Sequence, residues 1–364
     1  MKIKRQSSAS GIALIVVMLV ILVLATLAGA FAYSMKIEAT LARNGNNESE
    51  LEWMGRAGVE LARYVIAQQA TIPNEGNYES LNQKWAGGSG GIGGSNSPLA
   101  QISLENVPMG AGTFSIKITD LERKFNINLA NQAVLQQALT VMGVDASLSP
   151  SITDAVLDWV DKDDDAHLSG AESDYYMSLH PPYVSKNGPM DDISELLLLK
   201  GIYENPEIYW GSASTNHSAS AFQSRGNPIF NERPPPSYPF GLVDFFTTLS
   251  SGKINLNTAS ISALQMIPSV DENIAQGIIQ LRSGQDGSDG TDDDLPLHNV
   301  GELINVPGMR REIIQQLGPY CDVRSYTFEV QVDVDLGGLK RQYFAVIRRG
   351  SRPADFVILK FYWQ

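Results

Sequence analysis

A twelve-residue stretch that begins at Asp161 carries acidic residues at the spacing of a calcium-binding loop. Asp161, Asp163, Asp165 and Glu172 occupy positions 1, 3, 5 and 12, which supply side-chain ligands in an EF-hand loop. Hard oxygen ligands favour calcium over zinc or copper. The spacing therefore predicts a calcium site formed by these four residues.

The stretch departs from the EF-hand pattern at one position. Ala166 stands where an EF-hand has the glycine of its sharp turn, and His167 holds the position that offers a backbone carbonyl. A different path of the chain would bring in lesser candidates, which are Asp158, Asp174, Asp192 and the His167 backbone. The alternative is a solvated acidic loop without an ion, although carboxylates crowded this closely would repel one another.

A second acidic stretch runs from residue 285 to residue 294. Its aspartates Asp289, Asp292 and Asp294 are candidate ligands of a second ion, but no glutamate follows at the EF-hand spacing. We therefore favour a flexible, hydrated loop over a second metal site.

The two acidic stretches lie in a helical block with an internal repeat. FNINLA at 125–130 echoes INLNTA at 254–259, and ISELL at 193–197 echoes VGELI at 300–304. Each repeat contains one acidic stretch. We predict an inserted helical domain, residues 121–320, made of two related subunits at about 121–210 and 240–320.

Strand signals flank this helical block. Apolar and polar residues alternate at 113–118 and 328–334, a Gly337-Gly338 hairpin turn follows, and 343–348 and 356–362 supply two more strands. A long helix, residues 12–70, precedes them, because no proline interrupts the pattern before Pro73. The sequence therefore predicts an α+β fold. The helix packs on a small antiparallel, pilin-like sheet, a split domain of residues 71–120 and 321–364, and the helical domain is inserted between its strands.

The N-terminal end of the long helix is an uncharged apolar run, residues 12–33. Its length of roughly 33 Å suffices to cross a bilayer, and Lys2, Lys4 and Arg5 in front of it place residues 1–11 in the cytoplasm. The small residues that end at Gly11 precede the run, whereas a signal peptide is cut after it. Two interpretations remain: an uncleaved anchor, and a prepilin leader removed after Gly11 so that Ile12 begins the mature chain.

Composition argues against nucleic acid and against catalysis. The formal charge is −13, and removal of residues 1–11 leaves 24 basic against 40 acidic side chains, a charge of −16. Such a surface repels phosphate backbones. Cys321 is the single cysteine and cannot form an internal disulfide. Since no spacing points to a nucleophile with its base or to a zinc site, we do not expect an enzyme.

Residues 254–282 resemble a helix-hairpin-helix unit of DNA-uptake proteins. In that family the hairpin after the proline has two glycines that expose backbone N–H groups to a phosphate, whereas this chain has Ser269, Val270, Asp271 and Glu272 there. A later copy at 307–311 keeps one glycine and has two arginines. We interpret both segments as scaffold.

Taken together, the leader ending at Gly11, the apolar helix, the glycine-rich stretch 85–98, the acidic loop with its preceding DWVDKD at 158–163, and the INLN motif at 254–257 resemble the minor pseudopilin K family of type II secretion systems. These proteins belong to the type IV pilin-like superfamily. The resemblance extends over essentially the whole chain.

The resemblance implies a processed, membrane-inserted subunit without enzymatic activity. In the family, prepilin peptidase cuts after the glycine and methylates the new N-terminus, here Ile12. Most pilin-type subunits carry glutamate at mature position 5, where this chain has Val16, and its absence fits a subunit at the filament tip. The alternative is a minor pilin of a type IV pilus or DNA-uptake machine, with a nucleic-acid-binding insertion.

The family also implies a location and partners. The N-terminus would be cytoplasmic, the helix would lie in the inner membrane and the bulk in the periplasm. The partners would be minor pseudopilins I and J and the major pseudopilin, with no nucleic acid. The subunit would initiate or cap the periplasmic pseudopilus that exports folded proteins, and its inserted domain would hold calcium.

Overall fold

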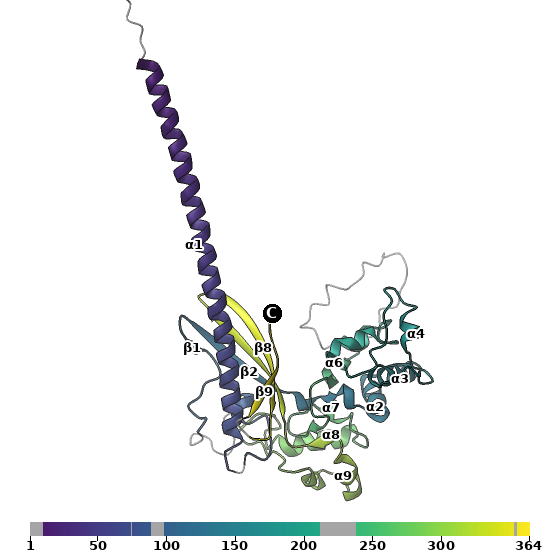
Figure 1. The fold of residues 1–364 in the computed structure, drawn as a ribbon. Coiled ribbons are helices and arrows are strands. Elements are labelled where there is room, and N and C mark those ends of the chain that lie inside the picture. Colours follow the sequence, from purple (N-terminus) through teal and green to yellow (C-terminus); the bar gives the residue numbers. More distant parts are fainter. Residues whose placement is uncertain (1–9, 74, 89–97, 212–237, 353–354) are drawn as a thin grey trace, which may run out of the picture.

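One helix of 60 residues, α1 (Ser10–Gln69), leads into a globular part made of a sheet and a helical domain (Figure 1). The computed structural model describes residues 10–73, 75–88, 98–211, 238–352 and 355–364. The basic residues of the predicted leader lie outside these ranges. The side chains of Gly11 and Ile12 are also not described, so the cleavage site stays a prediction.

The first half of α1 is apolar and is not covered by any of the described residues. Its side chains from Leu14 to Tyr33 are about half to two-thirds exposed. By length and composition this helix can cross a membrane. Exposed apolar residues on this scale are costly in water, so the half-helix is suited to a lipid environment.

The sheet has five antiparallel strands in the order β1-β2-β7-β8-β9. The strands β2, β7, β8 and β9 match the predicted ones, and the hairpin glycines Gly337 and Gly338 both have the positive φ that the tight turn requires. The three-residue β1 was not predicted because it is too short to show alternation. The bounds are β1 (Val107–Met109), β2 (Gly112–Asp120), β7 (Thr327–Leu336), β8 (Leu339–Arg349) and β9 (Phe356–Trp363).

The second half of α1 packs on one face of this sheet. Leu51, Met54 and Val65 are buried against alternate residues of β2, β7 and β8. Two glycines allow the close approach: a Cβ at Gly55 would meet the Tyr343 ring at 2.6 Å, and one at Gly58 would meet Val332 at 2.4 Å. This packing confirms the predicted arrangement of helix on sheet.

The helical domain is inserted between β2 and β7, which are neighbours in the sheet. It has its own hydrophobic core, separate from the core between α1 and the sheet. The α+β class with an insertion is therefore confirmed. Its elements are η3 (Leu121–Arg123), β3 (Phe125–Asn126), η4 (Ile127–Leu129), α2 (Gln132–Met142), α3 (Ser149–Val160), α4 (Ser173–Tyr176), η5 (Ile193–Leu198), α5 (Glu207–Trp210), α6 (Leu242–Phe245), β4 (Phe246–Thr247), β5 (Ile254–Asn255), α7 (Ile261–Leu264), α8 (Glu272–Arg282), η7 (Val300–Asn305), α9 (Arg311–Leu317) and β6 (Cys321–Asp322).

Equivalent asparagines make equivalent contacts in the two repeats. Asn128 exchanges hydrogen bonds with the backbone of Met190 at 3.0 and 2.7 Å, and Asn257 does the same with Leu297 at 2.9 Å in both directions. Each repeat also contains a short parallel strand pair, β3 with β4 and β5 with β6. The first pair reaches Thr247, which the prediction placed in the second subunit, and the second pair reaches Asp322, beyond the predicted end of that subunit.

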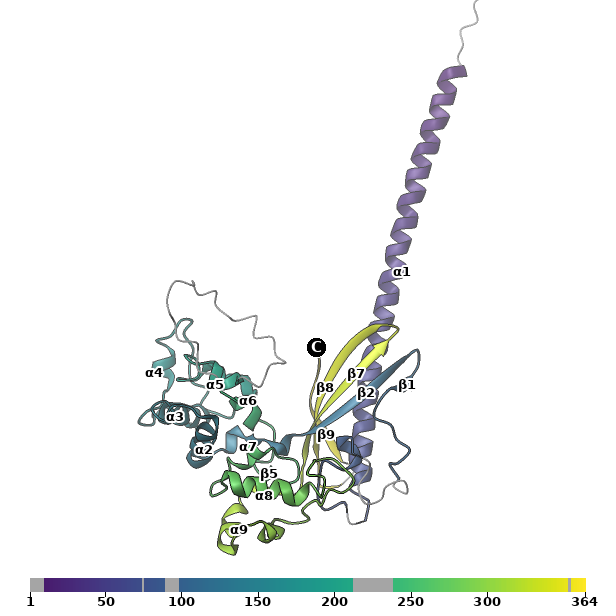
Figure 2. The same cartoon turned by 180° about the vertical axis from the view of Figure 1, so that it is seen from behind.

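The inserted domain lies to one side of the sheet, and α9 extends past the C-terminal end of α1 (Figures 1 and 2). The apolar half of α1 points the opposite way. If a membrane surrounds the apolar half of α1, the inserted domain lies on the side of the molecule away from that membrane.

Candidate metal centre

The first acidic loop begins at the C-terminal end of α3. The apolar side of this helix, which includes Val156 and Trp159, is buried in the core of the inserted domain. Asp158 lies on the same buried helix and has no exposed surface. A carboxylate in this position requires compensation by donors or by a cation.

Asp158 is held by the backbone of the loop that follows it. His167 N–H donates to Asp158 Oδ1 at 3.1 Å and Ala171 N–H donates to Oδ2 at 2.7 Å, while His167 Nδ1 contacts Oδ1. The loop is closed from outside by Lys200, whose ammonium group donates to the carbonyl oxygens of Ser169 and Gly170 at 3.1 and 2.9 Å. The Asp158 carboxylate therefore organises the loop around itself.

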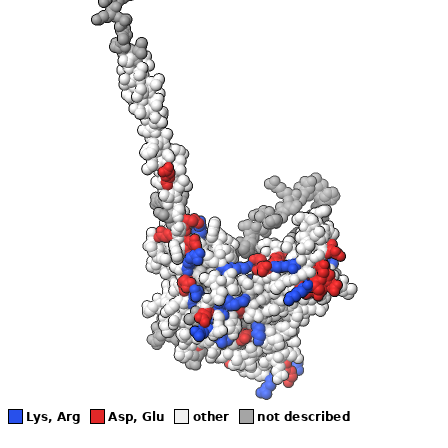
Figure 3. All heavy atoms as spheres, viewed as in Figure 1, with Lys and Arg blue, Asp and Glu red and all other residues white. Residues whose placement is uncertain are grey.

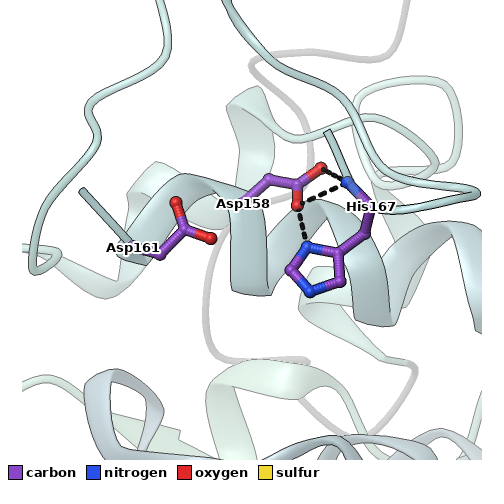
Figure 4. A group of neighbouring side chains, drawn as sticks. All are labelled: Asp158, Asp161 and His167. Carbon is purple, nitrogen blue, oxygen red and sulfur yellow. Dashed lines mark hydrogen bonds and ion pairs between the residues drawn. The ribbon is translucent and has the colours of Figure 1, made fainter. Parts of the chain in front are cut away.

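Asp158, Asp161 and His167 form a group whose ligand atoms all lie within 4.8 Å of one another. The Asp161 carboxylate is directed toward the contact between the other two side chains (Figure 4). A pocket lined in part by Val160, Asp161 and His167 opens beside the group, so solvent and ions have access to it.

Two carboxylates at this site have oxygens without a hydrogen-bond donor. Both oxygens of Glu172 and Oδ1 of Asp161 are buried and accept no hydrogen bond from the described residues. Burial, together with the charges of Asp158, Asp161 and Asp164, raises the pKa of Glu172 to about 7, while the Ser185 hydroxyl opposes the rise. Unpaired buried carboxylate oxygens in a group of like charges are what a bound divalent cation would satisfy.

The other predicted ligands lie elsewhere or are engaged. Asp163 and Asp165 are exposed and form a turn, in which Asp165 N–H donates to Asp163 Oδ1 at 3.2 Å. Asp192 caps η5 and lies 3.5 Å from Lys360, and Asp174 is exposed in α4. The His167 carbonyl accepts from Gly170 N–H at 3.1 Å. Asp163, Asp165, Asp174 and Asp192 do not belong to the group of three, and neither does Glu172, so the complete EF-hand ligand set stays a prediction.

Sequence reasoning missed two contributors to the site. It considered the His167 backbone but not its imidazole ring, and it gave Gly170 no role. The available signal was the Asp158 position itself, one helical turn before Asp161 on the buried face of α3, where a carboxylate needs nearby donors.

The second acidic loop has a different character, because its carboxylates are satisfied by the protein. Asp289 accepts two hydrogen bonds from the buried Arg282 at 2.9 and 2.6 Å. Asp294 accepts from Gly290 N–H at 2.7 Å, and Asp292 also has an interaction within the protein. Because the protein supplies these donors, the carboxylates of the second loop have less need of a bound cation.

Acidic side chains gather on the end of the inserted domain that is farthest from α1, in the region of α3 and α4 (Figure 3). This is the end that carries the first acidic loop. The accumulated negative potential would attract cations to the site.

Comparisons with known proteins find matches to one secretion family. Residues 116–209 match the model described as type II secretion system (T2SS), protein K. The type II secretion system protein K of Klebsiella pneumoniae is 27% identical over 206 residues, 53% of this chain and 58% of that protein. That of Pseudomonas aeruginosa is 22% identical over 360 residues, 94% of this chain and 89% of the relative. The chain is thus similar to the type II secretion system protein K family over most of its length.

The protein K family consists of minor pseudopilins, which are structural rather than enzymatic. The match spans only 58% of the Klebsiella relative's length. In fold, this chain resembles a chain in the crystal structure of the GspK-GspI-GspJ complex from the enterotoxigenic Escherichia coli type 2 secretion system. The TM-score is 0.62 at 16% identity, covering 89% of this chain and 99% of that one.

A second family model, the helix-hairpin-helix motif, matches residues 250–321 of this chain. At the first hairpin, Asp271 caps α8 by accepting from Ile274 N–H at 2.8 Å. The helix N-terminus that would hold a phosphate is thus occupied by the chain's own carboxylate.

Proposed function

We propose that the chain initiates or caps the tip of a periplasmic pseudopilus and thereby supports export of folded proteins across the outer membrane. The observation that carries this proposal is the place of the inserted domain, which lies beside the sheet and reaches past the end of α1 opposite its apolar half. A further subunit stacked beyond the C-terminal end of α1 would meet the inserted domain. The geometry is suited to a terminal position in a filament and unsuited to a repeating one.

The apolar half of α1 would hold the subunit in the inner membrane, with its N-terminus in the cytoplasm. Processing after Gly11 would leave Ile12 at the membrane-inserted end, and Val16 would take the place of a glutamate. A repeating subunit uses such a carboxylate to neutralise its neighbour's N-terminus, and one without a partner in the apolar core would be costly. A tip subunit has less need of it.

The partners we propose are minor pseudopilins I and J and the major pseudopilin. The similar chain comes from a structure that contains GspK, GspI and GspJ, and the shared fold supports a comparable assembly here. Prepilin peptidase would be the processing partner.

Calcium would stabilise the inserted domain at the first acidic loop. Asp161 and Glu172 would be its ligands, because Asp161 Oδ1 and both Glu172 oxygens are buried and accept no hydrogen bond from the described residues. A bound cation would neutralise the like charges there and tie the loop to the end of α3. Asp158, already occupied by backbone N–H groups, would position the loop.

Secretion by a deletion strain tests the role. The strain is complemented with wild type or with a variant that lacks residues 121–320, joined by a short linker. We expect wild type to restore secretion of a reporter enzyme and the shortened variant to assemble without restoring it. Mass spectrometry of the membrane-extracted protein should show methylated Ile12. An intact Met1 would contradict the pseudopilin proposal and leave a simple anchor.

One observation favours a second candidate, a minor pilin of a type IV pilus or DNA-uptake machine. It is the helix-hairpin-helix match over residues 250–321. Transformation efficiency in the same deletion strain separates the two: lost transformation with normal secretion would support DNA uptake, and the reverse supports the pseudopilus.

A further inference from the structure

The inserted domain is joined to the sheet through a buried polar cluster. The chain leaves β2 at Asp120 and enters β7 at Thr327, and side chains from five separate segments meet between these points. All are at least nine-tenths buried. We call this set the junction cluster: Glu79, Asp120, Glu122, Asn255, Ser325 and Arg349.

Asp120 links the sheet to the second half of the insertion. Its Oδ2 accepts from Ser325 Oγ–H at 2.6 Å, from Asn255 Nδ2–H at 3.2 Å and from the hydroxyl of Thr258. Its Oδ1 accepts from Glu122 N–H at 2.8 Å. One carboxyl group thus connects three segments that are far apart in the sequence.

Glu122 makes the second link through backbone donors alone. Its Oε2 accepts from Tyr326 N–H at 3.1 Å and Thr327 N–H at 2.9 Å, where the chain re-enters the sheet. Its Oε1 accepts from Ser251 N–H at 3.1 Å, in the insertion. This side chain therefore joins the two sides of the junction directly.

Glu79 closes the cluster on the side of the sheet. It pairs with Arg349 at 2.6 Å and accepts from Ser325 N–H at 2.8 Å, and its backbone carbonyl accepts from Asn255 Nδ2–H at 3.0 Å. Arg324 also acts on the Glu79 charge. The ion pair of Arg349 is with Glu79, whereas no described ion pair reaches Asp120 or Glu122 within 4.0 Å.

Asp120 and Glu122 are two buried acids that interact with each other. Burial raises the pKa of Asp120, and burial together with the Asp120 charge raises the pKa of Glu122 to about 8. Glu79 has a raised pKa from burial, which its pairing with Arg349 opposes. Lys124, which directly precedes strand β3, donates to the Val243 carbonyl at 2.8 Å, and burial lowers its pKa.

We propose that the junction cluster is a proton-dependent joint, which fixes the inserted domain to the sheet while the Asp120–Glu122 pair retains a proton and loosens when both groups are ionised. The seven hydrogen bonds to these two carboxyl groups give the joint its geometry, and repulsion between two buried charges opens it.

The direction of the pH effect follows from proton linkage. The ordinary Glu122 pKa is 4.5, and its value in the folded chain is about 8, so the folded chain holds a proton that the unfolded chain has lost. The stabilisation is complete below the ordinary pKa and is lost as pH rises through about 8. Mild acid therefore tightens the joint.

Hydrogen exchange of the full chain in detergent micelles tests the joint. The amides of Ser251, Tyr326 and Thr327 are followed from about pH 6 to about pH 9, corrected for intrinsic exchange, with the amides of α8 as internal reference. We expect junction protection to fall by about tenfold relative to α8, equivalent to one pKa unit. The decline should be absent in Glu122→Gln and retained in the control Glu105→Gln, which changes an exposed acid.

A second variant keeps the test decisive if Glu122→Gln folds poorly. The Ser325 hydroxyl lowers the pKa of Asp120, so Ser325→Ala should keep the proton longer and shift the loosening to higher pH. A role in packing alone would lower protection without moving that pH. The proposal is overturned if wild-type protection at the junction is independent of pH, if α8 loses protection in parallel, or if Ser325→Ala leaves the midpoint unmoved.

Discussion

Gly170 lies directly against the carboxylate of Asp158. A Cβ atom at this glycine would come within 1.9 Å of Asp158 Oδ2, which is the oxygen that also accepts from Ala171 N–H. The glycine is therefore required for the loop to close over the buried end of α3.

We expect Gly170→Ala to destabilise the inserted domain by about 1–3 kcal/mol, since overpacking displaces the carboxylate or the loop. Thermal unfolding of the full chain in detergent measures this. Gly188→Ala is the matched control, because a Cβ there would find only one atom, at 3.8 Å. Equal midpoints for both variants would show that the loop adjusts freely.

Calcium should stabilise the wild-type chain. At a free concentration of one hundred times Kd, binding to the folded state alone adds about 2.7 kcal/mol, and chelator should remove it. Glu172→Gln and Asp161→Asn should abolish the response, whereas Asp294→Asn, in the second loop, should retain it. A chelator-insensitive wild-type midpoint would argue against the metal site, and loss of the response in Asp294→Asn would place an ion in the second loop.

Two glycines of α1 should respond in opposite directions to alanine. Gly58→Ala places a methyl group against Val332 and should lower stability by about 1–3 kcal/mol. Gly45→Ala meets nothing within 4 Å and should raise it by about 0.5–1 kcal/mol, because alanine favours helix. Thermal unfolding measures both, and a stabilising Gly58→Ala would mean that α1 is less tightly seated than described.

Asp289→Ala should be strongly destabilising even though the second loop is largely exposed. It leaves the guanidinium of Arg282, whose side chain is 4% exposed, without its bidentate partner, and breaking such a pair costs about 3 kcal/mol. Denaturant unfolding gives the free-energy change. Asp286→Asn serves as the control, since Asp286 is exposed and accepts only from Ser288 N–H among the described donors.

The chain should not bind DNA through its helix-hairpin-helix segment. Asp271 occupies the first hairpin, and a charge of −16 after processing opposes a phosphate backbone. Fluorescence polarisation with a labelled duplex at low and physiological salt provides the measurement. Salt-dependent binding that Arg310→Glu removes would contradict this prediction and strengthen the DNA-uptake candidate.

The architecture was predictable because its signals are periodic. Alternation along β2 and β7 and the Leu51, Met54, Val65 stripe of α1 mark buried faces, and Gly337-Gly338 marks the hairpin. Short elements held by tertiary contacts, such as β1 and the two-residue strands β3 to β6, carry no periodic signal.

The site was predictable only in part. The acidic loop was located by its composition. The geometry of its ligands, however, depends on the path of the chain. That path is set by the contact between Asp158 and Gly170, which are 12 residues apart in the sequence. The junction cluster was invisible for the same reason. Asp120, Asn255 and Ser325 meet only after the insertion has folded, and nothing in their local sequences indicates the contact.

The antiparallel pairing of β2 with β7 also constrains the order of folding. Asp120 pairs with Phe328, so the sheet cannot close until the ends of a loop of about 200 residues have met, at an entropic cost that grows with loop length. If the insertion folds first, its compact core brings these ends together and the loop becomes effectively short. Folding of the inserted domain would then speed closure of the sheet that carries it.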